Sequence, residues 1–271
     1  MANFSRREVL GVFGLGALAI RAADPPFQFS MLDHLEFFVS DVQKSAAFYA
    51  RVFGNTVMKN NQTTRRYVKL GSAYVAIDTG QQIRVDHICA GIPSFNIANV
   101  HNYLRQQAIE YRDYPSGKDL SIGETDGGVR LQLAAENGWN ALMGNTASPE
   151  SIALKEEAIF LPSGLDHILL NVPDLEDGAA FYEKILGPAD RRDYPQAWFQ
   201  VGTSRLGLQK TLEGERAGVN RFCVGVAPFE YQAAAMKLEE AGAKLDAPQD
   251  VEAPTFRDPD GYRVQITRTR A

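Results

Sequence analysis

Four polar side chains, spaced along three strand-like segments, have the chemistry that binds metal ions and moves protons. They are His34, Glu36, His87 and Gln132. Because successive side chains of a strand point to opposite sides, these residues fall on one face while their apolar neighbours fall on the other. Imidazole, carboxylate and amide groups that share a hollow face can bind a divalent cation or exchange protons with a bound molecule.

The segment around His34 recurs later in the chain. Residues 32–41 read LDHLEFFVSD, and residues 165–174 read LDHILLNVPD. The separation is constant, since 167 − 34 and 187 − 54 both give 133 for the His34–His167 and Gly54–Gly187 pairs. A constant spacing indicates duplication of a folding unit, so the differences between the copies point to function.

Each half holds a second, weaker strand start, at residues 85–92 and 219–226, so the repeat is fourfold. Helix patterns follow the four starts at residues 42–53, 97–108, 175–186 and 231–241. Short strand patterns with turn residues come after each helix, which predicts an α+β fold of four βαβββ modules. Residues 139–164 lack a strand pattern and are predicted to be a linker, in which residues 154–160 could form a short helix.

The first 26 residues resemble an export signal rather than part of a domain. Arg6 and Arg7 precede an apolar run at residues 11–20, and small residues with two prolines follow it. Twin-arginine signals have this order, and the run is shorter than the ~20 residues that span a bilayer. Residues 1–26 are therefore predicted to be a signal peptide and leader. The mature protein is expected to be periplasmic or extracellular, without a stable membrane span.

Charge and cysteine usage narrow the class of partner. The formal net charge of −5 gives no general attraction for nucleic acid or anionic membranes, so a small molecule is the expected partner. Cys89 and Cys223 stand at matching places in separate copies of the repeat, so a disulfide between them is not expected. The sequence leaves open whether the chain forms a homodimer.

This pattern resembles the vicinal oxygen chelate (VOC) superfamily, which includes glyoxalase I, extradiol dioxygenases and bleomycin resistance proteins. The resemblance rests on the two LDH starts, the two AAFY helices that end before glycine, and the RDPDGY segment at residues 257–262. It implies that two modules pair into one barrel-like domain. The first VOC domain would then span residues 31–138 and the second residues 165–271.

In such proteins the metal ligands come from the first strand of each module and the last strand of the second module. The resemblance therefore implies that His34, His87 and Gln132 bind one divalent ion in the first half. The matching residues of the second half are His167, Arg221 and Gln265. Arg221 brings a permanent positive charge, which disfavours a cation there. Iron, manganese, nickel and zinc all suit histidine and oxygen donors.

Gln132 departs from the dioxygenase pattern, in which a carboxylate completes a two-histidine facial triad. Glu36 could supply the missing negative charge, with Asp78 a weaker source, and Glu36 could equally be the catalytic base. The predicted substrate contacts are Arg130, Cys89, Phe38 and Asp78. The structural alternatives are a hydrogen-bonded histidine, a small cavity-lining cysteine and a surface-paired arginine.

Two functions of different class remain open. The first is a metal-dependent enzyme, dioxygenase-like or a glyoxalase-like lyase or isomerase, acting on a small molecule with vicinal oxygens. The second is a non-catalytic protein that sequesters a small ligand, as bleomycin resistance relatives do. In a third hypothesis the second half serves as an interface or lid for the first. Metal analysis of the purified protein separates the first two.

Overall fold

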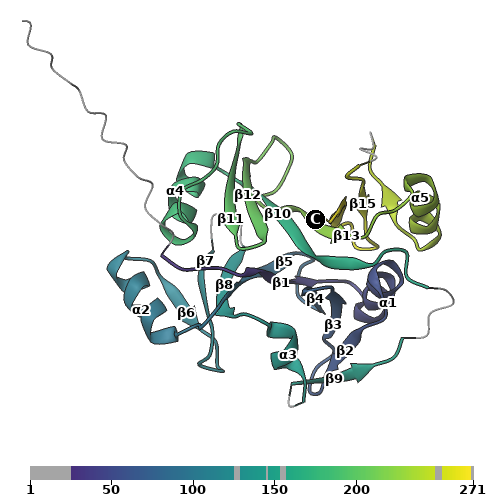
Figure 1. Ribbon diagram of the computed structural model, residues 1–271, viewed down its shortest axis with the longest axis horizontal. Helices are drawn as coiled ribbons and strands as arrows, with labels where there is room; N and C mark the ends of the chain where they lie inside the picture. The colour runs from purple at the N-terminus through teal and green to yellow at the C-terminus, as the bar shows by residue number, and fades with distance from the viewer. Residues whose placement is uncertain (1–25, 125–128, 145, 153–156, 248–251, 270–271) are drawn as a thin grey trace, which may run out of the picture.

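The computed structural model describes residues 26–124, 129–144, 146–152, 157–247 and 252–269, and its two sheets are stacked as in Figure 1. The helices are α1 (Val42–Phe53), α2 (Ile97–Gln106), α3 (Gly138–Leu142), α4 (Leu175–Leu186) and α5 (Tyr231–Glu240). The strands of the first sheet are β1 (Met31–Phe38), β2 (Val57–Asn60), β3 (Arg66–Leu70), β4 (Ala73–Asp78), β5 (Val85–Ile92), β6 (Tyr111–Asp113), β7 (Leu120–Glu124), β8 (Arg130–Ala135) and β9 (Ala147–Glu150). Those of the second sheet are β10 (Pro162–Val172), β11 (Gln196–Val201), β12 (Ser204–Lys210), β13 (Gly218–Val226), β14 (Lys244–Leu245), β15 (Thr255–Arg257) and β16 (Arg263–Arg268).

The repeat in the sequence becomes a repeat of helix capping. Asp41 begins α1 by accepting hydrogen bonds from the backbone N–H groups of residues 43 and 44, and Asp174 begins α4 in the same way. Gly54 and Gly187 end these helices with φ angles of 117° and 84°. A side-chain acceptor at the start and a positive φ at the end explain why the predicted bounds of both helices match the structure.

The fold class is the predicted one, with one correction to its shape. In each half the first strands of two modules pair antiparallel at the centre of one sheet, β1 with β5 and β10 with β13. The strand orders run β6-β7-β8-β5-β1-β4-β3-β2-β9 and β11-β12-β10-β13-β16-β15-β14. The outer strands β6 and β9 are not paired with each other, and neither are β11 and β14. Each half is therefore an open, curved sheet among the described residues rather than a closed barrel.

The segment predicted to lack strands contains a helix and two stretches of strand. The short helix α3 begins at Gly138, β9 pairs antiparallel with β2, and β10 starts at Pro162. The sequence did not predict β9 because Pro149 interrupts its pattern, and proline is tolerated there because β9 lies at the edge of the sheet. The predicted helix at residues 154–160 lies partly outside the described residues, and residues 157–160 are not helical.

The two halves share one core because helices α1 and α4 pack on their own sheets and also reach the other half. A single cluster of buried apolar side chains includes residues of both sheets. Helix α1 of the first half packs on the second sheet, where Phe48 and Tyr49 contact Phe256 and Phe222. Helix α4 of the second half lies beside α2, whose Tyr103 donates a hydrogen bond to the Lys184 carbonyl (Figure 1). Phe37, on the apolar side of β1 as predicted, is fully buried in this core.

The turn before β16 locks α1 against the second sheet. Tyr49 Oη donates a 2.8 Å hydrogen bond to Asp258 Oδ2, while Asp258 Oδ1 accepts from the backbone N–H groups of Asp260 and Tyr262. Burial raises the pKa of Asp258 to about 6, although these hydrogen bonds oppose the shift. Ionising the Asp258 carboxyl group therefore costs free energy in the folded chain.

Asp258 is expected to make the fold weaker as the pH rises. A carboxyl whose folded pKa is raised contributes stability that is present below its unfolded pKa, near 4, and is lost as the pH passes about 6. Asp258→Asn should remove this slope, so the mutant should gain on the order of 2–3 kcal/mol relative to wild type between pH 4 and pH 7. Urea unfolding at both pH values measures the change, and equal slopes for the two proteins would contradict it.

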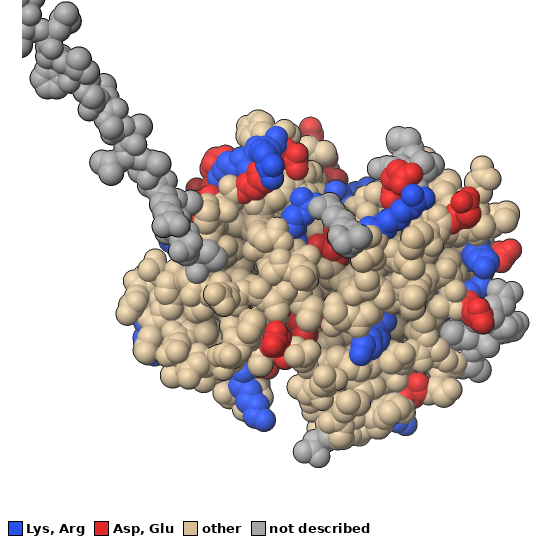
Figure 2. All heavy atoms as spheres, in the orientation of Figure 1, with Lys and Arg blue, Asp and Glu red and all other residues tan. Residues whose placement is uncertain are grey.

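Two surface facts complete the fold. No helix among the described residues is long and apolar enough to cross a membrane. On the face shown in Figure 2, basic and acidic groups lie in small neighbouring patches with uncharged surface between them. The predicted export signal at residues 1–26 lies almost wholly outside the described residues, so it stays a prediction.

Candidate metal centre

His34 on β1 and His87 on β5 meet on the helix-free face of the first sheet. The two strands pair antiparallel, with Glu36 opposite His87 and His34 opposite Cys89. The side chains are buried, His34 being 8% and His87 5% exposed. The alternation read from the sequence therefore brings both imidazoles into one protected cluster.

The two imidazoles point the same kind of nitrogen at each other. His34 Nε2 lies 3.2 Å from His87 Nε2. On their other sides, His34 Nδ1 lies 2.8 Å from Asp33 Oδ1 and His87 Nδ1 lies 3.0 Å from Asp86 Oδ2. A carboxylate accepts a hydrogen bond from a protonated Nδ1, which leaves the lone pair of the neutral ring on Nε2. Two lone pairs at 3.2 Å repel unless a proton or a metal ion lies between them.

The separation of the two Nε2 atoms suits a shared metal ion. With metal–nitrogen bonds of about 2.0–2.1 Å, a distance of 3.2 Å corresponds to an angle of about 100° at the metal. This value lies between octahedral and tetrahedral geometry. Burial lowers the pKa of His87 to about 4, against the hydrogen bond from its side chain to Asp86, so His87 is a neutral donor at pH 7.

Gln132 on β8 supplies a buried oxygen on the same face of the sheet as this pair. Residue 132 is opposite Cys89, which is opposite His34, so the three residues form a row across β1, β5 and β8. Gln132 is 7% exposed, and its Oε1 has no hydrogen-bond partner among the described residues. An unpartnered buried carbonyl oxygen is costly, and a bound cation would satisfy it. The predicted donor set therefore fits a metal ion.

Glu36 lies in the same cluster and is held by an arginine. Arg65 Nη2 is 2.7 Å from Glu36 Oε1, and Arg65 Nε is 2.9 Å from Asp78 Oδ2. Burial raises the pKa of Glu36 to about 7, while Arg65 opposes the rise. The predicted base thus has a fixed carboxylate close to His34. Asp78 is linked to Glu36 only through Arg65, which forms an ion pair with each of them.

Arg130 and Tyr114 border a cavity of about 110 Å³, which Ser121 also lines. Arg130 forms an ion pair with Asp86, and its guanidinium lies 6.0 Å from the ring of Tyr114. The hydroxyl of Tyr114 is buried and has no hydrogen-bond partner among the described residues. Burial tends to raise the pKa of Asp86, but the hydrogen bond from His87 and the charge of Arg130 lower it to about 2.

The other two predicted substrate contacts lie in different surroundings. Cys89 is 1% exposed between His34 and Gln132, and burial raises the pKa of its thiol, so the sulfur is neutral. Phe38 lies at the end of β1, with the guanidinium of Arg84 5.5 Å from its ring centre. Both residues are on the face of the histidines. Their contact with a substrate stays a prediction.

The second half provides an internal comparison. His167 is again paired through Nδ1 with the preceding aspartate, at 2.7 Å from Asp166 Oδ1. Its Nε2, however, lies 3.1 Å from Gln265 Oε1, and Arg221 Nε donates to the same oxygen at 3.1 Å. The oxygen that lacks a partner in the first half therefore has two in the second. The guanidinium of Arg221 stands where His87 stands in the first half.

The side chains that orient the candidate ligands were not predicted from the sequence. Arg65 reaches Glu36 from the loop before β3, and Tyr74 on β4 stacks on the His34 ring at a centroid distance of 4.5 Å. The paired carboxylates, in contrast, had a visible signal, because the dipeptide Asp-His occurs at residues 33–34, 86–87 and 166–167. The backbone N–H of Gly138 also binds Asp33 Oδ2.

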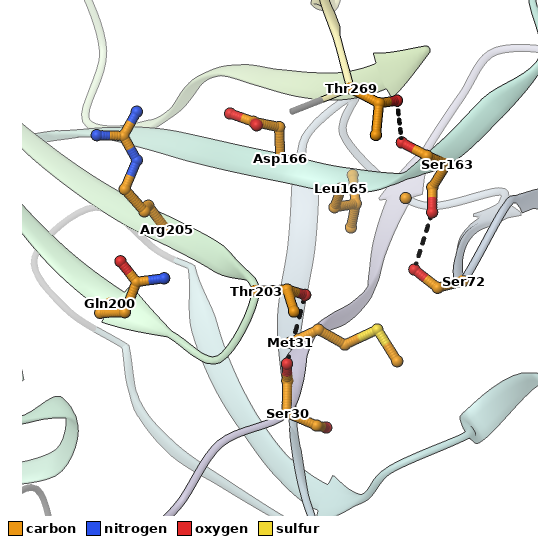
Figure 3. A pocket seen from close by; sticks show the side chains of 12 residues that line it. Ser30, Met31, Ser72, Ser163, Leu165, Asp166, Gln200, Thr203, Arg205 and Thr269 are labelled. Carbon is orange, nitrogen blue, oxygen red and sulfur yellow. Dashed lines mark hydrogen bonds between the residues drawn. The ribbon is translucent and has the colours of Figure 1, made fainter. Parts of the chain in front are cut away.

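A larger cavity, of about 500 Å³, lies away from the histidine pair, where the two halves meet. Figure 3 shows hydroxyl side chains on both of its sides, with Ser72, Ser163 and Thr269 linked by hydrogen bonds. Asp166 and Arg205 line the same cavity. Its size alone does not make it the reactive site, because it lacks the convergent donors found around His34.

Two family profiles match the chain, one in each half. The profile of the Glyoxalase-like domain matches residues 167–267. The profile of the Glyoxalase/Bleomycin resistance protein/Dioxygenase superfamily matches residues 31–84, which include β1 and Glu36. A comparison with curated proteins finds no match.

Solved structures with the same fold include ring-cleaving dioxygenases and a glyoxalase. The 2,3-dioxygenase LapB from Pseudomonas sp. KL28 has a TM-score of 0.71 at 16% identity, over 90% of this chain and 94% of that one. The Mn(II)-bound glyoxalase from Novosphingobium aromaticivorans has a TM-score of 0.64 at 15% identity, over 89% and 82% of the two chains. The 2,2',3-trihydroxybiphenyl 1,2-dioxygenase from Sphingomonas wittichii strain RW1 has a TM-score of 0.61 at 17% identity, over 89% and 91%. At these identities the likeness establishes the fold.

Proposed function

We propose that this chain, which belongs to the vicinal oxygen chelate superfamily, is a metal-dependent enzyme that acts on a small molecule with vicinal oxygens. The metal-binding residues would be His34, His87 and Gln132, in the first half. The observation that carries the proposal is the 3.2 Å separation of the two Nε2 atoms, each ring being held from behind by an aspartate.

A bound divalent ion would act as a Lewis acid that stabilises negative charge on the oxygens of a chelated substrate. The chain itself supplies the rest of the chemistry. Glu36 holds a carboxylate beside His34 and is positioned to accept a proton from a bound molecule, while Arg65 fixes its Oε1. The buried Tyr114 hydroxyl and Arg130, beside their cavity, are positioned to donate hydrogen bonds to the ligand.

Elemental analysis tests the metal directly. Protein purified without chelators should hold about one divalent ion per chain, because the donor set forms one site in the first half and Arg221 disfavours a second. The identity of the ion, among iron, manganese, nickel and zinc, is read from the same measurement. If the purified chain holds no metal, and neither added metal nor chelator changes its melting temperature, the protein would be a non-catalytic ligand-binding protein instead.

The reaction class needs a second measurement. A dioxygenase-like enzyme consumes oxygen with a catechol, whereas a glyoxalase-like enzyme exchanges a carbon-bound proton of a vicinal hydroxycarbonyl compound with solvent deuterium. Glu36→Gln keeps the size of the side chain but removes the base. Loss of exchange with the metal retained would support the proton-transfer class, while oxygen uptake would support the dioxygenase class.

We also propose, from the sequence of residues 1–26 alone, that the protein is exported. The support is the arginine pair at Arg6 and Arg7, the apolar run that follows and the small residues after it. Mass spectrometry of the mature N-terminus tests this, since an uncleaved chain in the cytoplasm contradicts it.

A further inference from the structure

A row of basic side chains crosses the second sheet at one level. Residue pairing places Lys244 opposite Arg257, and Arg257 opposite Arg263. Arg221 lies beside Arg263, because the parallel β13–β16 ladder pairs the next residues, Phe222 and Val264. We call Lys244, Arg257, Arg263 and Arg221 the basic row. It runs over β14, β15, β16 and β13, on the right of Figure 1.

The first sheet carries different chemistry at the same level. There Glu36 is opposite His87, which is opposite Arg130. In the second sheet the residue opposite Arg221 is Leu169, so both the carboxylate and the imidazole are replaced. The two halves of the duplicated chain therefore differ in whether they suit a bound cation or a bound anion. A cation suits the first row and an anion suits the basic row.

The basic row is poorly neutralised within the chain. Like charges opposite each other on neighbouring strands are destabilising, so such a row needs a counter-charge. Asp246 provides one carboxylate for two guanidinium groups, with Arg257 Nε at 3.0 Å and Arg263 Nε at 2.8 Å. Within the described part of the chain, Asp246 is the one carboxylate that forms ion pairs with the row, and it reaches only Arg257 and Arg263.

Arg221 and Arg263 converge on one neutral oxygen. Arg221 Nη1 lies 3.3 Å and Arg263 Nη1 3.2 Å from Asn220 Oδ1. The remaining contact of Arg221 is to the amide oxygen of Gln265, so this partly buried guanidinium has amide oxygens as partners. Burial and the charge of Arg263 lower the pKa of Arg221, which reflects the repulsion between the two. Paired guanidinium groups of this kind are the usual ligands of phosphate oxygens.

A cavity of about 250 Å³ is lined by two members of the basic row, Arg257 and Arg263, together with Asn171, Asn220 and Tyr262. Arg216 and Glu215 also line it and add one charge of each sign. We propose that this cavity binds the phosphate group of a small molecule, through Arg257 and Arg263, the two members of the basic row that line it. A dianionic phosphate balances the excess of positive charge better than a single carboxylate does. The site is separate from the histidine cluster and does not depend on the proposed function.

Calorimetric titration of the full chain with inorganic phosphate tests the proposal. Binding should be saturable at constant ionic strength, and acetate should bind at least tenfold more weakly. Arg257→Gln and Arg263→Gln should each weaken phosphate binding at least about tenfold, because each removes a charge-assisted hydrogen bond from a side chain that lines the cavity. Arg268→Gln is the matched control. It makes the same charge change on β16, outside the row, and should alter the affinity less than twofold.

Three results would overturn the proposal: no saturable phosphate binding, equal binding of acetate, or equal loss in Arg268→Gln. Circular dichroism checks that each variant is folded, and Arg263→Gln alone decides the test if Arg257→Gln does not fold. His87→Ala should leave phosphate affinity unchanged. Failure of the metal proposal and failure of this one are therefore distinguishable.

Discussion

Alanine at position 87 is expected to lower the affinity of the chain for a divalent metal by about 100-fold or more. His87 contributes one of two Nε2 donors that lie 3.2 Å apart, and the other two histidines have partners elsewhere, His101 with Asp113 and His167 with Gln265. His34→Ala should have the same effect. The measurement is metal content after dialysis, followed by titration of the apoprotein with the ion found in the wild type.

The duplicated half supplies the control for this experiment. His167→Ala removes an imidazole at the strand position that matches His34. Like His34, it is paired through Nδ1 with the aspartate that precedes it. Its Nε2 contacts Gln265 beside Arg221, so the variant should keep the full metal content. If His167→Ala lost the ion while His34→Ala and His87→Ala kept it, the site would be in the second half.

Substitutions of Asp33 and Asp86 then test whether these residues bind the metal themselves or only orient the histidines. Asp33→Asn and Asp86→Asn leave both imidazoles in place but remove the carboxylates behind them. The loss of metal affinity should be smaller, about 10-fold to 100-fold, because such partners orient the ring and raise its basicity. A loss as large as that of His87→Ala would mean that an aspartate itself binds the metal.

The candidate site was predictable where it depends on local periodicity. A strand period of two fixes which residues share a face, so His34, Glu36 and His87 could be grouped before any contact was known. The duplication strengthened this grouping, because two copies with one spacing define the start of each module. The difference between His87 and Arg221 likewise required only the sequence.

The contacts made by Arg65 could not be predicted in the same way. This arginine lies in the loop before β3, and its distance from Glu36 depends on the parallel pairing of β1 with β4 and on the hairpin between β3 and β4. The contact of α1 with the second sheet is similarly a property of how the halves dock. Long-range pairing of this kind has no local signal in a single sequence.

The docking of the halves leads to the second large effect, an expected loss of stability in Gly202→Ala. Gly202 turns the chain between β11 and β12 with φ of +58°, and a Cβ there would lie 1.9 Å from the Ser30 carbonyl oxygen. The neighbouring Thr203 N–H donates to that same oxygen. Gly71, in the β3–β4 turn, approaches Ser163 in the corresponding way, so each half docks a hairpin turn against the start of the first strand of the other.

Gly202→Ala should therefore cost on the order of 3–5 kcal/mol, because backbone strain and a clash with main-chain atoms add. Gly117→Ala separates the two contributions. Gly117 has a similar φ of +64°, but no atom lies within 4 Å of the place that an added methyl group would take, so this substitution should cost only about 1–2 kcal/mol. Chemical unfolding of both variants gives the comparison. Equal losses would show that strain alone acts at Gly202, and that the contact with Ser30 yields without cost when the two halves shift apart.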